Sequence, residues 1–166
     1  MKNQAEPKSW GILILLTLIA IVSLLDRQII SILAVEIKND LGLNDGEIGL
    51  IYGTFFGIFY ALFAIPLGKL ADGWDRTKQI AATITTWCAA TIGCGLSGSF
   101  ASMSVFRAAV AAGESGVGPA SNSMLADLFP SRLRGIAFGV LMPQATLGMG
   151  LSIWFGGVFL GYWNSL

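Results

Sequence analysis

Five long apolar runs, separated by short charged segments, constrain this chain more than any other feature. A helix needs about 20 mostly apolar residues to cross roughly 30 Å of hydrocarbon. Five segments meet this requirement, at about 10–35, 48–67, 80–97, 103–128 and 135–160. They are much longer than strands and lack a sustained alternation of period two. The sequence therefore predicts an all-α fold, a polytopic bundle of five transmembrane helices.

The composition agrees with a membrane protein and excludes several other classes. Only 12% of the residues are charged, about half of the quarter that is typical of soluble domains. Ten basic residues balance ten acidic residues, so nothing suggests a nucleic-acid partner. Histidine is absent, which removes Ser-His-Asp triads and most zinc sites. Neither GxSxG nor HExxH occurs. We predict no enzyme, no metal and no cofactor.

The distribution of positive charge predicts the orientation in the membrane. Lysine and arginine are enriched in cytoplasmic loops. Lys38 alone falls in the loop after the first span, whereas seven basic residues fall before that span or in the even-numbered loops: Lys2, Lys8, Lys69, Arg76, Lys78, Arg132 and Arg134. We therefore expect a multi-pass protein of the cell (inner) membrane with a cytoplasmic N-terminus. Tyr162 and Trp163 would then anchor the outer end of the fifth span.

Small residues four apart predict close contacts between helices. Such residues let helix backbones approach where no hydrophobic force drives their association. The pairs and the longer stripe are Gly53 and Gly57, Gly157 and Gly161, and Gly148, Ser152 and Gly156. Tight packing of a static bundle and contact between moving parts remain equally open interpretations.

Four charged residues lie well inside the predicted spans, away from their ends: Asp26, Arg27, Arg107 and Glu114. A charge at the bilayer centre costs about 2.5–3.5 kcal/mol on insertion scales, so such residues usually serve a function. Arg107 and Glu114 are seven residues apart, which puts them on one helix face at a separation of roughly 10 Å. That distance is too long for a direct ion pair. We therefore expect pairing between the charges of the first helix and those of the fourth.

Carboxylates held among these arginines would suit proton coupling. Burial favours the protonated carboxyl group and a neighbouring arginine favours the ionised one, so proton affinity can follow what else is bound. The alternative is a static ion-pair network that locks the bundle.

Pro119 also lies inside the fourth span, among Ser115, Ser121, Asn122 and Ser123. A proline removes a backbone hydrogen bond and kinks a helix. The kinked segment is either the lining of a binding site or a packing feature.

Two blocks of sequence carry a family resemblance. The loop after the second span reads Gly68-Lys-Leu-Ala-Asp72-Gly-Trp-Asp-Arg76-Thr-Lys78. It resembles the GxxxDxxxR signature of the major facilitator superfamily. The stretch from Arg107 through Pro119 and on to Gly135 is similar to the next conserved block of that superfamily. Four short stretches resemble the Spinster-type branch in particular: Leu25-Asp26-Arg27, Gly49-Leu50, Phe59-Tyr60-Ala61 and Gly113-Glu114.

The resemblance implies a fold and a set of roles. It implies twelve helices in two halves, with alternating access to a substrate bound between them. Asp26 and Glu114 would carry protons, and Arg27 and Arg107 would hold an anionic headgroup or tune those carboxylates. Gly68, Asp72 and Arg76 would form a cytoplasmic latch, in which the aspartate caps a helix and the arginine pairs across the interface. The substrate would be a small or lipid-like organic molecule, such as a lysophospholipid.

The chain also departs from the family pattern. Gly73 stands where a basic residue usually follows the aspartate, which weakens the latch, and Ala111 stands where glycine is frequent. The sixth helix and the whole second half are missing, so we expect a fragment: five helices of an incomplete N-terminal half over residues 1–166. The competing hypothesis is a membrane module without transport activity, or a non-functional fragment, that oligomerises through its glycine faces.

Overall fold

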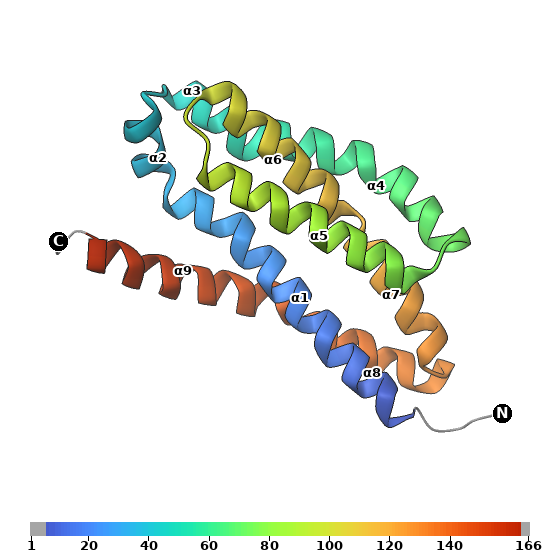
Figure 1. Ribbon diagram of the computed structural model, residues 1–166. Coiled ribbons are helices and arrows are strands. Elements are labelled where there is room, and N and C mark those ends of the chain that lie inside the picture. The colour runs from blue at the N-terminus through green and yellow to red at the C-terminus, as the bar shows by residue number, and fades with distance from the viewer. Residues whose placement is uncertain (1–5, 164–166) are drawn as a thin grey trace. The chain divides into compact units, whose positions relative to one another are not determined.

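The computed structural model describes residues 6–163, with only the backbone of Trp163, and these residues are helical apart from short connections (Figure 1). Lys2 and the side chain of Trp163 lie outside the described part. The helices are α1 (Pro7–Ile32), α2 (Ala34–Leu41), α3 (Asp45–Gly49), the π-helix η1 (Leu50–Phe55), α4 (Phe56–Gly73), α5 (Arg76–Gly95), α6 (Phe100–Ser115), α7 (Val117–Leu128), α8 (Ser131–Leu141) and α9 (Gln144–Trp163).

Each predicted span has a helical counterpart, which confirms the predicted fold class. Among the described helices, three are long and apolar enough to cross a membrane: Pro7–Ile32, Asp45–Gly73 and Ser131–Tyr162. The other two predicted spans correspond to α5 and to α6 with α7. These contain threonine, serine and buried charged side chains.

The helices extend further into the charged segments than the apolar runs do. The second span begins at Asp45 and ends at Gly73, and α5 begins at Arg76. Asp75 caps α5 by accepting hydrogen bonds from the backbone N–H groups of Thr77 (2.9 Å) and Lys78 (3.2 Å). The apolar residues of a sequence indicate which part of a helix lies in hydrocarbon, whereas the capping residues indicate where the helix begins and ends.

Two prolines account for two breaks within the predicted spans. The fourth span is interrupted at Gly116, between α6 and α7. Pro119 follows three residues later, and a proline ring clashes with the carbonyl group four residues before it, here that of Ser115. The kink predicted for this span is therefore present. The fifth span is interrupted between Leu141 and Gln144, where Pro143 stands.

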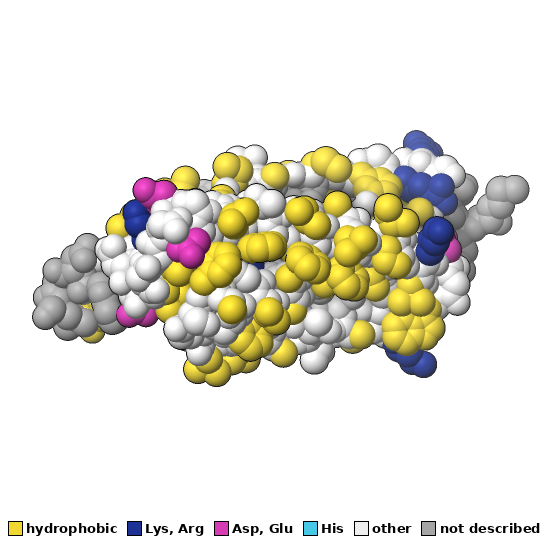
Figure 2. Space-filling view, turned by 90° about the horizontal axis from the view of Figure 1, so that it is seen from above, with side chains coloured by type: hydrophobic (Ala, Val, Ile, Leu, Met, Phe, Trp, Pro, Cys, Tyr) yellow, Lys and Arg dark blue, Asp and Glu magenta, His cyan; other side chains and the backbone are white. Residues whose placement is uncertain are grey.

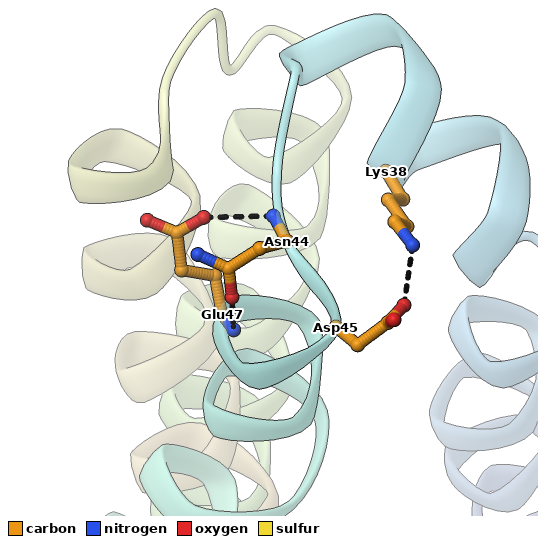
Figure 3. A network of polar contacts seen from close by, with 4 residues as sticks. All are labelled: Lys38, Asn44, Asp45 and Glu47. Carbon is orange, nitrogen blue, oxygen red and sulfur yellow. Dashed lines mark hydrogen bonds and ion pairs between the residues drawn. The ribbon is translucent and has the colours of Figure 1, made fainter.

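A short polar turn joins α2 to α3 (Figure 3). Gly42 has a φ of 64°, a conformation that residues with a Cβ rarely adopt. Asn44 and Glu47 form a capping box, since each side chain accepts a hydrogen bond from the backbone N–H of the other residue at 2.9 Å. Lys38 pairs with Asp45 across the turn. The helix α2 was not predicted, because its polar sequence carries no membrane signal.

The described residues divide into two compact units: 6–33 with 124–163, and Ala34–Ser123. In the first unit, α1 packs against α9 and α8. A Cβ added to Gly148 would lie 2.6 Å from the Cβ of Leu24, and one added to Gly156 would lie 2.7 Å from Ile32. Ser152, between these glycines, is fully buried. The predicted stripe of small residues is thus the contact between α9 and α1.

In the second unit, α6 packs against α5 and α4 (Figure 1). The crossing of α5 and α6 is close, because a Cβ on Gly113 would lie 2.8 Å from the backbone nitrogen of Trp87 and 3.0 Å from the carbonyl oxygen of Thr83. The side chain of Gln79 joins α5 to α4 by donating a 2.7 Å hydrogen bond to the Leu67 carbonyl oxygen. By contrast, a Cβ on Gly53, Gly57, Gly157 or Gly161 would meet no described atom within 4 Å.

Candidate functional site

The candidate site is built on α6, which carries two of the four predicted charges. Arg107 is 0% exposed and Glu114 is 3% exposed. Ser99 starts the helix by accepting a hydrogen bond from the backbone N–H of Ser102 at 3.2 Å. From that start, positions seven apart fall two turns apart on one face. Both side chains are therefore held inside the protein by the same rigid element.

The ring of Phe56, an aromatic residue of α4, faces Arg107. The guanidinium carbon lies over the ring of Phe56, 5.0 Å from its centroid. The ring of Phe56 stacks on that of Tyr60, with centroids 5.8 Å apart and an interplanar angle of 25°. A cation within about 6 Å of a ring centroid is attracted by the ring quadrupole. Phe56 is 6% exposed, so this contact lies away from water.

Phe56 was not predicted as a site residue. It is the first residue of α4 and directly follows the π-helix η1, and its backbone N–H bonds to the Gly53 carbonyl group. A π-helical turn contains one more residue than an α-helical turn and changes which side chains face a neighbour. Apolar periodicity carries no mark of such a turn. The resemblance at Phe59-Tyr60-Ala61 pointed to this region but assigned no role to it.

The position of Glu114 depends on its neighbour Gly113. Because Gly113 lacks a side chain, α6 approaches the backbone of α5 closely at Trp87 and Thr83. Ser115, which follows Glu114, is fully buried and donates a 2.8 Å hydrogen bond to the Ala112 carbonyl oxygen. Glu114 thus stands beside a close approach of α5 and α6, immediately before the break at Gly116.

Asp26 and Arg27 belong to the first unit. Both lie on α1 and are half-buried. Arg107 and Glu114 belong to the second unit. The predicted pairing between the two helices stays a prediction.

The predicted latch residues lie around the turn between α4 and α5. A Cβ on Gly68 would lie 4.0 Å from the Cβ of Pro119. Asp72 is exposed in the last turn of α4, and the Nε of Arg76 donates a 3.2 Å hydrogen bond to the Ala71 carbonyl oxygen. The cap of α5 is Asp75, which was not predicted. The roles expected for Asp72 and Arg76 stay predictions.

The polar residues around Pro119 do not share one environment. Ser121 is 5% exposed, whereas Asn122 is exposed and Ser123 is half-buried. The role of these residues as a lining stays a prediction. A mostly apolar cavity of about 250 Å³ lies elsewhere in the second unit, between α4, α5 and α6. Phe63, Leu67, Trp74 and Thr83 are among its lining residues, and no predicted site residue lines it.

Comparison with known proteins gives this arrangement a family context. A model of the Major Facilitator Superfamily matches residues 16–166. An MFS-type efflux pump of Mycolicibacterium smegmatis is 31% identical over 151 residues, which are 91% of this chain and 35% of the pump. The hexuronate transporter of Bacillus subtilis is 28% identical over 141 residues, which are 85% of this chain and 33% of that transporter. The chain thus spans about a third of the length of these relatives.

Two solved structures of a bacterial homologue of the human lysosomal transporter Spinster are also similar. In the inward-facing occupied conformation the TM-score is 0.90 at 35% identity, over 95% of this chain and 34% of that chain. In the inward-facing unoccupied conformation the TM-score is 0.89 at 35% identity, over 93% and 32%. The resemblance to the Spinster-type branch is thereby confirmed.

Proposed function

The chain belongs to the major facilitator superfamily, and on that basis we propose that it is the N-terminal part of a proton-coupled secondary transporter. The cargo is a small or amphiphilic organic anion, which crosses the membrane by alternating access. One observation carries this proposal: Arg107 and Glu114, an ionisable base and an ionisable acid, are both buried on one face of α6. Family and relatives point to a transporter and not to an enzyme.

The burial of these two groups supports a functional role. Removing an ionised side chain from water costs several kcal/mol, even after the surroundings relax. In a bundle held only by packing, replacing buried ionised groups by apolar residues of similar size is often neutral or stabilising, so stability alone gives no reason for these two charges. Arg107 has no exposed surface, so cargo reaches it only when the surrounding helices move. Alternating access supplies such a movement.

The anionic cargo is supported by the chemistry of arginine. Its guanidinium group presents N–H donors in a planar fork that matches a carboxylate or a phosphate group. The Bacillus subtilis relative is a hexuronate transporter, and a hexuronate carries one carboxylate. The Spinster-type resemblance adds phosphate-bearing amphiphiles such as lysophospholipids. Arg27, on α1, is the second residue that we propose for binding an anionic group.

Proton coupling is assigned to Glu114 and Asp26. A carboxyl group in a poorly solvated site favours its protonated form, and a nearby arginine favours the ionised form. When an anion binds the arginine, its negative charge opposes ionisation of the carboxylate, so cargo binding and proton binding become linked. Gly68, Asp72 and Arg76 would form the latch that closes the cytoplasmic side during the cycle.

Transport by the protein encoded by the complete reading frame tests the proposal. Proteoliposomes would be loaded at one pH and diluted into another, and uptake of radiolabelled D-glucuronate, lysophosphatidylglycerol and D-glucose would be followed. We expect accumulation of at least one of the two anions that depends on the pH difference, and none of neutral D-glucose. Equal movement of all three probes with and without a pH difference would reject the proposal.

The substitution Arg107→Ala separates cargo binding from a structural role. We expect the apparent Kd for the transported anion to rise about tenfold to hundredfold, since hydrogen bonds to charged groups contribute about 1.5–3 kcal/mol each. The midpoint of thermal unfolding should change little by comparison. Both quantities are measured on the purified protein. A large fall in the unfolding midpoint with unchanged anion affinity would instead support the static ion-pair network.

The orientation of the second unit follows from its charges. Lys69, Arg76 and Lys78 surround the turn after α4, whereas Asp45 and Glu47 stand at the other end of the same span. Many apolar side chains are visible on the face shown in Figure 2. By the positive-inside bias, we propose that the Lys69–Lys78 end of this span faces the cytoplasm of a cell with an inner membrane. The same rule, applied separately to Lys2 and Lys8, gives a cytoplasmic N-terminus.

Single cysteines test this orientation in a background where Cys88 and Cys94 are replaced by serine. Asp45 is 91% exposed in its side chain, so Asp45→Cys should react with a membrane-impermeant maleimide in intact cells. The matched variant Lys78→Cys, at an exposed position beyond the other end of the span, should react only after permeabilisation. The opposite pattern of labelling would invert the topology.

A further inference from the structure

The contact between Phe56 and Arg107 has a consequence for cargo recognition. We propose that Phe56 is a positioning residue, which holds the guanidinium group of Arg107 ready for the carboxylate or phosphate group of the cargo. This inference rests on the proposed function and adds a residue from α4 to the anion site. It starts from the 5.0 Å distance between the Arg107 guanidinium carbon and the centroid of the Phe56 ring.

An aromatic ring stabilises a buried arginine differently from a carboxylate. The ring attracts the cation through its negative face but has no lone pair for a directional, two-pronged hydrogen bond. A carboxylate of the protein would match the N–H fork of the guanidinium group, which is the same feature that an anionic cargo needs. The Phe56 ring therefore attracts the positive charge, beside the other interactions of Arg107, without itself accepting a two-pronged hydrogen bond.

The backbone around Phe56 is specialised for this position. The six residues Leu50–Phe55 form a π-helix, a conformation that accounts for well under 1% of residues in globular proteins and is frequent at functional sites. Its extra residue rotates the segment before it by about 100° relative to Phe56 and the rest of α4. The segment that begins at the cap residue Asn44 and the segment that begins at Phe56 therefore turn differently oriented faces toward neighbouring helices.

Two neighbouring aromatic residues sharpen the assignment. Tyr60 lies one helical turn after Phe56 and stacks on its ring, which restricts the orientation that the ring presents to Arg107. Phe55 precedes Phe56 directly, but its ring faces that of Phe100 at 6.3 Å. Phe55 therefore offers a matched control: the same residue type, one position away, directed at a different partner.

The experiment compares anion affinities of the full-length protein in detergent. D-glucuronate and lysophosphatidylglycerol are the anionic probes, and D-glucose is the neutral one. Phe56→Leu keeps most of the side-chain volume but removes the ring, and we expect it to weaken binding of the anion about tenfold to thirtyfold, the factor of a desolvated cation–π contact. Phe56→Tyr keeps the ring and should bind within threefold of the wild type, as should Phe55→Leu. If Phe56→Leu does not fold, Phe56→Met replaces it in the same comparison.

The outcomes separate this inference from the function on which it rests. Unchanged anion affinity in Phe56→Leu, together with a large loss in Arg107→Ala, would overturn the role of Phe56 alone. Equal losses in Phe56→Leu and Phe55→Leu would also overturn it, because a general packing effect would then account for both. A wild type that binds neither anion, or an Arg107→Ala variant with wild-type affinity, would overturn the proposed anion site and this inference with it.

Discussion

Replacing Gly113 by valine should prevent α5 and α6 from packing and should leave little folded protein. A Cβ at this position would lie 2.8 Å from the Trp87 nitrogen and 3.0 Å from the Thr83 carbonyl oxygen. Both are backbone atoms, so no rotation of a side chain relieves the clash. Overpacking typically costs 1–3 kcal/mol. We expect about 3 kcal/mol or more here, because the valine methyl groups add to the clash of the Cβ.

The matched control is Gly118→Val, at a glycine of α7 where a Cβ meets no described atom within 4 Å. Fluorescence-detected size-exclusion chromatography and the thermal unfolding midpoint would be measured for both variants. We expect a monodisperse protein with a near wild-type midpoint for Gly118→Val and aggregation or a much lower midpoint for Gly113→Val. Equal behaviour of the two variants would show that the close crossing at Gly113 is not required.

Replacing Glu114 by glutamine should abolish pH-driven accumulation of cargo while the protein remains folded. Glutamine has nearly the same shape as glutamic acid but cannot gain or lose a proton. Because Glu114 is 3% exposed, bulk water does not take over its role of binding and releasing a proton. We expect accumulation in proteoliposomes to fall to the level of empty liposomes, whereas exchange of labelled for unlabelled cargo, which needs no net proton transfer, should continue.

Asp40→Asn provides the comparison for this variant, since Asp40 is an exposed carboxylate of α2. It should accumulate cargo as the wild type does. Asp26→Asn should share the defect of Glu114→Gln if both carboxyl groups carry protons. Full pH-driven accumulation by Glu114→Gln would remove this residue from proton coupling and would leave Asp26 as the remaining candidate.

Much of the fold could be predicted from the sequence, because lipid imposes a simple requirement. Each span must be helical and apolar over about 20 residues, so five apolar runs indicate five helical segments. The kink near Pro119 followed from the geometry of proline. The polar helix α2 and the ends of the helices could not be read from apolarity. They depend on caps such as Asn44 and Asp75, whose hydrogen bonds are local.

The candidate site was only partly predictable, for a physical reason. A charge inside an apolar run is conspicuous, so Arg107 and Glu114 could be singled out, and their burial agrees with that choice. Phe56 is an aromatic residue in an apolar helix, and nothing in its spacing distinguishes it from a residue that faces lipid. Its contact with Arg107 depends on the register after the π-helix η1, which the spacing of apolar residues does not reveal.

The contacts of the glycine stripes were also only partly predictable from the sequence. Gly148, Ser152 and Gly156 were predicted to form a helix contact, and they do so against α1. Gly53 and Gly57 have the same spacing, but a Cβ added to either would meet no described atom within 4 Å. Spacing alone indicates that a helix can be approached closely. It does not indicate whether a neighbour is present.

The central claim is that a buried carboxyl group exchanges its proton as cargo binds. Infrared difference spectroscopy of the full-length protein, recorded with and without the transported anion, measures this directly. We predict a change in the absorption of a protonated carboxyl group when the anion is added, and its absence in Glu114→Gln. A carboxyl spectrum that the anion leaves unchanged, in a protein that demonstrably binds it, would contradict the account.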